Sequence, residues 1–330
     1  MTGPPIVSVI VPTRDYARYL PEAIASVQAQ TLTSWECIVI DDGSVDSTPA
    51  VLDEIVRTDP RIKVLRQPRT GVSAARNLGL AAALGRHVQF LDADDRLGAV
   101  KLAEQVAVLE ARPGVDVVYG RAEFVIRAGD QPVRELLDPA AGLAWRFPET
   151  SGDEMLELLL VHNRFVVEAP LVRRSILDKA GIFDERLDRM EDWDLWIRIA
   201  LAGARFAFIE SAQPTVYVGV HGASVSQGEL EMLSAEVVVR ERLEPMLRKR
   251  PAARRLNSCG LLSRRMALAV MRGLDGEVRR STQELLVLAV RSRRPRWLIW
   301  ALMLPMAHLG GGRRLLAWLW SRHRAAAGTA

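Results

Sequence analysis

Short β-rich runs alternate with helical patterns through the first hundred residues, and this alternation constrains the fold more than any other feature of the sequence. The β-rich runs span residues 7–11, 35–40, 62–65 and 87–91, and between them apolar residues recur at the spacing of a helix face. Such alternation is typical of a mostly parallel sheet that is covered by helices. The sequence therefore predicts an α/β fold.

A change of composition after Pro245 divides the chain. Residues 246–330 contain 18 Lys and Arg but 3 Asp and Glu, a formal charge of +15, whereas the whole chain carries only +4. Leu, Ala and Arg recur there in helical periodicity. We expect a sheet-containing domain over residues 1–245, with halves 1–100 and 101–245, followed by a basic helical appendage.

The pattern is less regular beyond the first hundred residues. A stretch rich in Pro, Gly and charge, 128–151, indicates a loop, and 163–173 is irregular. Helical or β-rich patterns continue around these segments: helices over 101–111, 153–162 and 193–202, another that begins near 174, and a strand over 115–120.

The bulk composition describes a folded protein. Hydrophobic residues make up 49% and charged residues 25% of the chain, which excludes wholesale disorder. Two cysteines cannot form a disulfide framework, and no apolar leader with a cleavage site precedes the first periodic segment. We expect a reducing, cytoplasmic setting.

Acidic clusters follow two of the expected strands. Asp92, Asp94 and Asp95 come directly after the run at 87–91, and ligands of open α/β sheets collect at such strand ends. Two carboxylates separated by one residue suit Mg²⁺ or Mn²⁺, which keep open positions for phosphate oxygens. A solvated turn, with one Asp capping the next helix, would give the same pattern.

A second acidic turn, Asp41-Asp42-Gly43-Ser44, follows the run at 35–40. Asp42 could accept a hydrogen bond from a ligand N–H, although a plain strand-to-helix turn fits equally well. Arg76 lies near the start of a small, apolar helix, where it could face water or meet a phosphate or a base.

Two further segments offer chemistry. Glu191 and Asp192 precede a periodic helix, where Asp192 could be an N-cap or a general base on a hydroxyl. His221 lies in a Gly- and Ser-rich turn after an apolar strand, where it could be polar surface or could bind a metal or a phosphate.

Taken in order, these segments resemble the family 2 glycosyltransferases with the GT-A fold. The resemblance covers about residues 5–225. Five motifs carry it: VSVIVPT at 7–13, IDDGSVDST at 40–48, GVSAARNLG at 71–79, FLDADD at 90–95 and EDWDLWIR at 191–198.

The resemblance implies an inverting transfer of a hexosyl-type sugar, in which an acceptor hydroxyl attacks a nucleoside diphosphate sugar in line. It makes 1–100 the nucleotide-binding half and 101–245 the acceptor half. The residues that it implies for binding the nucleotide sugar are Pro12, Thr13, Asp42, Arg76 and Asp92.

The same resemblance implies a divalent cation, Mn²⁺ or Mg²⁺, with Asp94 as its direct ligand and Asp92 beside it. His221 matches a family histidine near the metal and the diphosphate, but the arginine that often precedes that histidine is missing here. Asp192 matches the proposed general base, and Glu191 would orient that base or the acceptor. The Q-x-x-R-W motif of polymerising synthases is absent, which favours single or limited sugar addition.

Two other function classes remain open from the residues alone. A nucleotidyltransferase also pairs aspartates on a metal, but it normally needs a glycine-rich basic loop after the first strand, and residues 12–16 contain no glycine. A non-catalytic binding protein could use the basic tail to hold nucleic acid or a membrane. Intact Asp94 and Asp192 argue against a role in binding alone.

The basic tail predicts contact with an anionic membrane surface through residues 291–324. Tryptophans and arginines intermix there around apolar runs that are too short to span a bilayer. The enzyme would then work at the inner face of the cytoplasmic membrane as a peripheral protein, on a lipid-linked or cell-envelope glycan. A helical hairpin packed on the catalytic domain, or on a second subunit in a homodimer, is the alternative. Nucleic acid is not expected, because exposed stacking aromatics are lacking.

Overall fold

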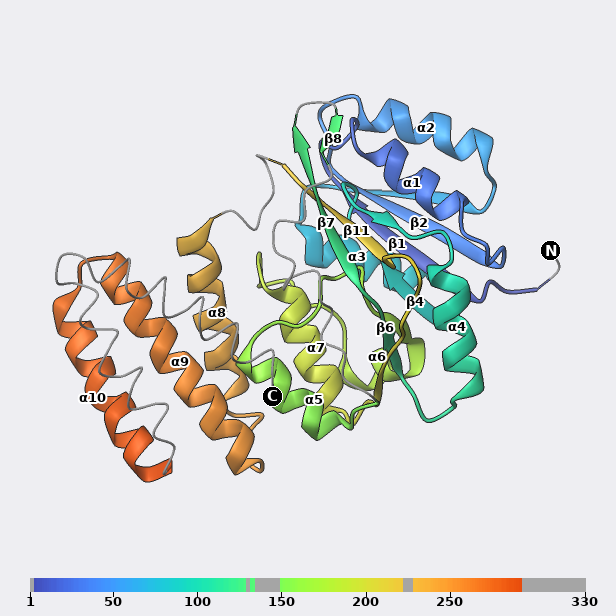
Figure 1. Ribbon diagram of the computed structural model, residues 1–330. Helices are drawn as coiled ribbons and strands as arrows, with labels where there is room; N and C mark the ends of the chain where they lie inside the picture. Colours follow the sequence, from blue (N-terminus) through green and yellow to red (C-terminus); the bar gives the residue numbers. More distant parts are fainter. Residues whose placement is uncertain (1–2, 129–130, 134–148, 222–227, 293–330) are drawn as a thin grey trace. The chain divides into compact units, whose positions relative to one another are not determined.

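The five expected β-rich runs and two short strands that were not expected, β9 and β10, form one seven-stranded sheet with the order β10-β6-β9-β4-β1-β2-β3. Figure 1 labels β1, β2, β4 and β6 of this sheet. Every pairing in it is parallel except those of β9, which runs antiparallel to β4 and β6. The α/β prediction is confirmed. The strands are β1 (Val7–Thr13), β2 (Trp35–Asp42), β3 (Ile62–Gln67), β4 (His87–Phe90), β6 (Val117–Tyr119), β9 (Leu171–Arg173) and β10 (Phe206–Phe208).

This computed structural model describes residues 3–128, 131–133, 149–221 and 228–292. By its internal contacts the chain divides into two units, 1–227 and 228–330. The division falls earlier than the one expected after Pro245, because the helix over Glu229–Leu243 packs against the helix that follows it.

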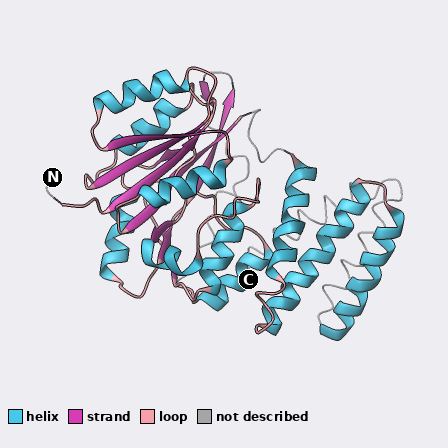
Figure 2. Ribbon diagram, turned by 180° about the vertical axis from the view of Figure 1, so that it is seen from behind, coloured by secondary structure: helices cyan, strands magenta, loops and turns pink. Residues whose placement is uncertain are grey.

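Helices cover both faces of the sheet in the first unit, as Figure 2 shows from behind. On one face, Val7 and Val9 of β1 join a buried cluster with apolar residues of α1 (Leu20–Gln28), α2 (Thr48–Thr58) and α4 (Lys101–Ala111). Alternate residues of the same strand face the opposite side. The remaining helices of this unit are α3 (Val72–Ala82), α5 (Gly152–Val161), α6 (Arg174–Ala180) and α7 (Glu191–Leu201).

Close packing of α3 on the sheet depends on Gly79. A Cβ atom at this position would lie 2.5 Å from Ile10 Cγ2 and 2.7 Å from Ile40 Cδ1. Any larger residue would push α3 away from β1 and β2. The glycine therefore fixes how near the polar residues of α3 come to the carboxyl ends of these strands.

A smaller sheet, in the order β5-β11-β7-β8, holds the loop that leaves β4. β5 follows Asp95 at once and pairs with β11, which ends directly before His221. The two sheets thus fix both ends of the acidic loop. The strands are β5 (Arg96–Leu97), β7 (Ala122–Ala128), β8 (Gln131–Val133) and β11 (Val216–Val220), and β8 lies within the stretch expected to be loop.

The second unit contains α8 (Glu229–Leu243), α9 (Pro251–Met271) and α10 (Asp275–Ser292) in its described part. Val237 of α8 packs on Leu261 and Leu268 of α9, and Val278 of α10 packs on Met266 and Ala269 of α9. Within the ranges that the structure describes, none of the helices combines the length and apolar character needed to cross a bilayer. The segment expected to meet a membrane, 291–324, lies outside those ranges except for its first two residues.

Candidate active site

The acidic loop after β4 is fastened to the end of β11. Asp95 Oδ1 accepts a hydrogen bond of 2.7 Å from the Gly219 N–H, and Asp94 Oδ2 lies 2.9 Å from His221 Nε2. Asp94 and His221, which the sequence places far apart, therefore meet at one point. Burial and the neighbouring charge of Asp92 raise the pKa of Asp94, while the contact with His221 opposes this rise.

The imidazole of His221 forms an aromatic cluster with two tyrosines that directly precede α1. The Tyr19 ring stacks on it with centroids 4.7 Å apart, and the Tyr16 ring meets it edge-on at 6.1 Å. Burial, followed by the charge of Asp94, raises the pKa of Tyr16. These aromatic contacts orient the ring of His221, for which the sequence left open polar surface, a metal ligand or a phosphate contact.

Glu168 is a buried carboxylate at this site that was not among the residues predicted from the sequence. Oxygens of Asp92, Asp95 and Glu168 lie within 4.8 Å of one another, and Glu168 is only 2% exposed. Burial, and then the charge of Asp92, raises the pKa of Glu168 to about 8. The one sequence feature that could have pointed to Glu168 is its position as a single carboxylate inside an otherwise apolar run at 165–172.

The donor atoms at this edge of the sheet fit Mn²⁺ or Mg²⁺. Carboxylate oxygens suit these ions, and Mn²⁺ also accepts an imidazole nitrogen. Asp92 is 35% exposed and Asp94 16% exposed, so both can meet a bound phosphate, whereas Asp95 and Glu168 are enclosed. Among the described residues, the carboxylates close enough together to hold one ion are those of Asp92, Asp95 and Glu168. The other two predicted ligands, Asp94 and His221, contact each other and stay predicted ligands.

Arg76 of α3 lies between two of the predicted site residues. Its guanidinium donates through one Nη atom to Asp92 Oδ1 and through the other to Glu191 Oε1, each at 2.6 Å. Burial alone would lower the pKa of this arginine, but the two carboxylates raise it. One permanently charged group thus brings the acidic loop and the start of α7 together.

Asp192 is the second residue of α7, and the N-cap position is taken by Met190 in the left-handed conformation, with φ of 59°. Asp192 is therefore not the cap residue, although its Oδ1 accepts the Trp193 N–H at 2.7 Å. Asn163 Nδ2 donates to Oδ2 at 3.0 Å. Burial, and then the charge of Glu191, raises the pKa of Asp192 to about 7.

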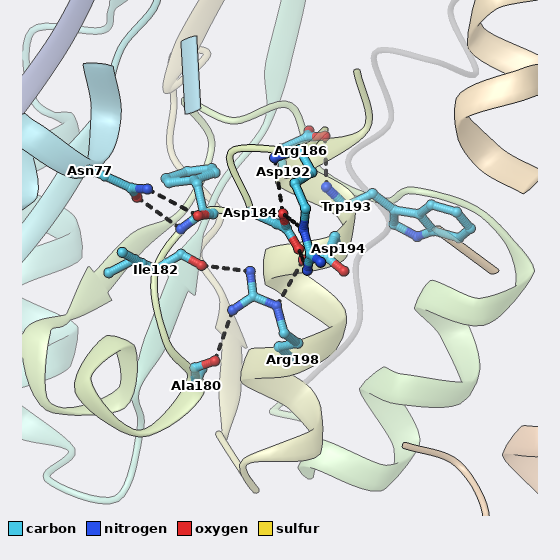
Figure 3. A network of polar contacts seen from close by, with 10 residues as sticks. Asn77, Ala180, Ile182, Asp184, Arg186, Asp192, Trp193, Asp194 and Arg198 are labelled. Carbon is cyan, nitrogen blue, oxygen red and sulfur yellow. Dashed lines mark hydrogen bonds and ion pairs between the residues drawn. The ribbon is translucent and has the colours of Figure 1, made fainter. Parts of the chain in front are cut away.

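The loop before α7 is fixed by the network drawn in Figure 3. Arg198 of α7 donates to Asp194 and to the carbonyl oxygens of Ala180 and Ile182, at 2.8 Å in each case. Asn77 of α3 exchanges two hydrogen bonds with the backbone of Phe183. These contacts limit the movement of Asp192 relative to α3.

At the ends of β1 and β2 the predicted nucleotide residues lie in register. Thr13 pairs with Asp41, and Asp42 follows it, almost fully buried. Asp42 accepts hydrogen bonds from the Gln67 side chain and from the N–H groups of Thr70 and Gly71. It therefore shapes the 67–71 loop, and the Thr13 hydroxyl has no hydrogen-bond partner among the described residues.

Comparison with known proteins gives a consistent family. The family model described as Glycosyl transferase family 2 matches residues 8–179. An uncharacterised glycosyltransferase of Nostoc sp. is 38% identical over 49% of this chain and 52% of its own length, and EpsJ of Bacillus subtilis is 38% identical over 57% and 54%. The chain thus spans about half the length of these curated relatives. TuaG of Bacillus subtilis, named as a putative teichuronic acid biosynthesis glycosyltransferase, is 38% identical over 33% of this chain and 43% of its own length.

Solved structures share the fold at low sequence identity. S. aureus TarS in complex with UDP-GlcNAc superposes with a TM-score of 0.64 at 18% identity, over 91% of this chain and 86% of that one. The mannosyltransferase PcManGT of Pyrobaculum calidifontis, in complex with GDP-Man and Mn²⁺, gives 0.55 at 20% identity over the same shares. The fold is of the GT-A type.

Proposed function

Because this chain belongs to glycosyltransferase family 2, we propose that it is an inverting, metal-dependent enzyme that moves a sugar from a nucleoside diphosphate sugar to a hydroxyl group. The observation that carries the proposal is the pair of 2.6 Å contacts from Arg76 to Asp92 and Glu191. They bring the acidic loop and the Glu191-Asp192 pair to one edge of the sheet. A donor and an acceptor need both groups at the same place.

The donor half of the site lies at the ends of β1, β2 and β4. Asp42 with the backbone of Pro12 and Thr13 would hold the nucleoside, and Asp92, Asp94 and His221 would hold the cation. A bound Mn²⁺ or Mg²⁺ neutralises charge that develops on the departing diphosphate. The complexes of TarS with UDP-GlcNAc and of PcManGT with GDP-Man and Mn²⁺ support this choice of ligands.

Asp192 would remove the proton from the attacking hydroxyl. A general base works best when its pKa lies near the working pH, and the pKa of Asp192 is raised to about 7. Glu191 is held by Arg76 in an ion pair of 2.6 Å, which fixes the position of its carboxylate. The base role therefore falls to Asp192, while Glu191 helps to orient it.

For the acceptor we propose a lipid-linked or cell-envelope glycan. The name of the relative TuaG, which refers to teichuronic acid, supports an envelope polymer. The charge and tryptophan content of residues 291–324 support contact with an anionic membrane at the inner face of the cytoplasmic membrane. The alternative for the same segment is a homodimer through the C-terminal helices.

A screen of nucleotide sugars tests the core of this proposal without a known acceptor. Full-length protein is incubated with UDP-GlcNAc, GDP-mannose and other donors in Mn²⁺ and in EDTA, and release of the nucleoside diphosphate is measured. We expect slow hydrolysis of at least one donor in Mn²⁺, lost in EDTA. Absence of both hydrolysis and donor binding across the screen would refute the transferase assignment.

A further inference from the structure

Arg76 has an environment that suits a fixed link better than a ligand contact. The side chain is 2% exposed, and both terminal nitrogens are occupied by Asp92 and Glu191. The remaining donor, Nε, is buried and has no hydrogen-bond partner among the described residues. A group this enclosed offers almost no surface to a nucleotide, which was the role expected from the sequence.

Several neighbouring contacts fix the position of the Arg76 side chain. Its guanidinium lies 5.2 Å from the centre of the Phe183 ring, which in turn meets the Phe90 ring edge-on at 4.9 Å. On the same helix, Asn77 binds the backbone of Phe183 and Ser73 donates to the Leu187 carbonyl oxygen. α3 thus contacts the loop before α7 at several points, and Arg76 is the one that also reaches the acidic loop.

From these contacts we propose that Arg76 is a positioning residue, which ties the metal-side Asp92 to Glu191 and so holds the neighbouring Asp192 at a fixed place beside the donor. The inference rests on the proposed transferase function. It assigns Arg76 to the alignment of the base with the donor and not to binding of the nucleotide.

Alignment and binding have separable consequences. A nucleotide contact contributes to donor affinity, so its loss raises the donor Kd and leaves the turnover of bound donor largely intact. The contacts that join Asp92, Arg76 and Glu191 would contribute to the rate, because they place the base near the acceptor. Their loss should therefore lower kcat and change donor affinity little. Arg76→Lys discriminates the two, because one ammonium group cannot bind both carboxylates in the forked geometry of a guanidinium.

The test uses full-length Arg76→Lys with whichever of UDP-GlcNAc or GDP-mannose the wild type hydrolyses. Donor Kd is measured by calorimetry in Mn²⁺, and kcat is measured by release of the nucleoside diphosphate. We expect kcat to fall at least about tenfold while Kd stays within about threefold. Arg174→Lys is the matched control, because Arg174 also binds α3, through the carbonyl oxygens of Leu80 and Ala83, but does not contact the site.

A second variant removes the other partner of the contact between Arg76 and Glu191. Glu191→Ala removes the tie but leaves Asp92 to balance Arg76, so it remains informative if Arg76→Lys fails to fold. Loss of Glu191 also removes a charge that raises the pKa of Asp192. Rates are therefore compared at pH 9, where Asp192 is ionised in every variant, and we expect Glu191→Ala to stay at least about fivefold slower there.

The outcomes are distinct. A large rise in Kd with unchanged kcat in Arg76→Lys would overturn the positioning role and favour the nucleotide contact. Full activity of Glu191→Ala at pH 9 would also overturn it, since the link would be dispensable. A wild-type protein that neither binds nor hydrolyses any donor would instead refute the proposed function itself.

Discussion

A hydrogen bond from Asn163 helps to set how readily the Asp192 carboxyl gives up its proton. Asn163 Nδ2 donates to Oδ2 at 3.0 Å and favours the charged form, against burial and the charge of Glu191, which raise the pKa to about 7. Asn163→Ala removes this donor. The remaining groups that act on Asp192 are Glu191, Arg76 and the Trp193 N–H.

The size and sign of the effect follow from the geometry. A hydrogen bond to a charged group is worth about 1.5–3 kcal/mol, or about one to two pKa units. Asp192 is partly exposed, so water replaces some of the lost donor and we expect the lower end, about one unit upwards. At pH 7 the ionised fraction would fall from about one half to about one tenth, and kcat/KM about fivefold.

The assay is the pH profile of kcat/KM for donor hydrolysis, which reports ionisations of the free enzyme. The wild type should rise with pH through about 7, and Asn163→Ala should rise about one unit later and reach nearly the same limiting rate. The limiting rate is an internal control for correct folding. A profile lowered equally at every pH, or one with no rise near neutral pH in the wild type, would refute Asp192 as the titrating base.

The other predictions concern the base, the cation, the packing of α3 and the tail. Asp192→Asn should lower turnover at least about a hundredfold with donor affinity unchanged, whereas Asp188→Asn, an exposed aspartate in the preceding loop, should have no effect in the same calorimetric and rate assays. Asp94→Asn should weaken Mn²⁺-dependent donor binding at least about tenfold and His221→Ala less, and equal donor affinity in Mn²⁺ and EDTA for the wild type would contradict the cation site. Gly79→Ala should lower the midpoint of thermal unfolding, because its Cβ would lie 2.5 Å from Ile10. Full-length protein should float with anionic liposomes, less so in high salt, and replacement of Trp297, Trp300, Trp318 and Trp320 by alanine should reduce flotation; unchanged flotation would contradict the membrane proposal.

Most strands of the main sheet could be predicted from the sequence, because the pattern that identifies each strand lies within one short segment. β1, β2 and β4 are short, fully buried segments rich in apolar residues, and the helices between them repeat apolar residues on one face. The start of α4 at Lys101 and its end at Ala111 coincide with the predicted range for the same reason. Motifs at the strand ends could then be located, since they follow these runs directly.

The pairing of the smaller sheet could not be predicted, because it joins distant parts of the chain and includes a very short strand. β5 has two residues, and its partner β11 lies more than a hundred residues later in the chain. β9 has three residues and enters the main sheet antiparallel, between β4 and β6. Segments of this length show no usable periodicity, so the position of Glu168, just before β9, could not be inferred.

The adjacent carboxylates of Glu191 and Asp192 in α7 have different partners. Glu191 pairs with a buried arginine at 2.6 Å, while the charge on Asp192 is met by two neutral donors, Asn163 and the Trp193 N–H. The ion pair fixes the position of the Glu191 carboxylate. Burial of a carboxyl that no cation contacts directly raises its pKa toward neutrality. Because burial and the charge of Glu191 raise the pKa of Asp192 to about 7, Asp192 can take and release a proton near physiological pH. Sequence motifs name both residues, and their different partners in space support the proposed roles, alignment for Glu191 and proton transfer for Asp192.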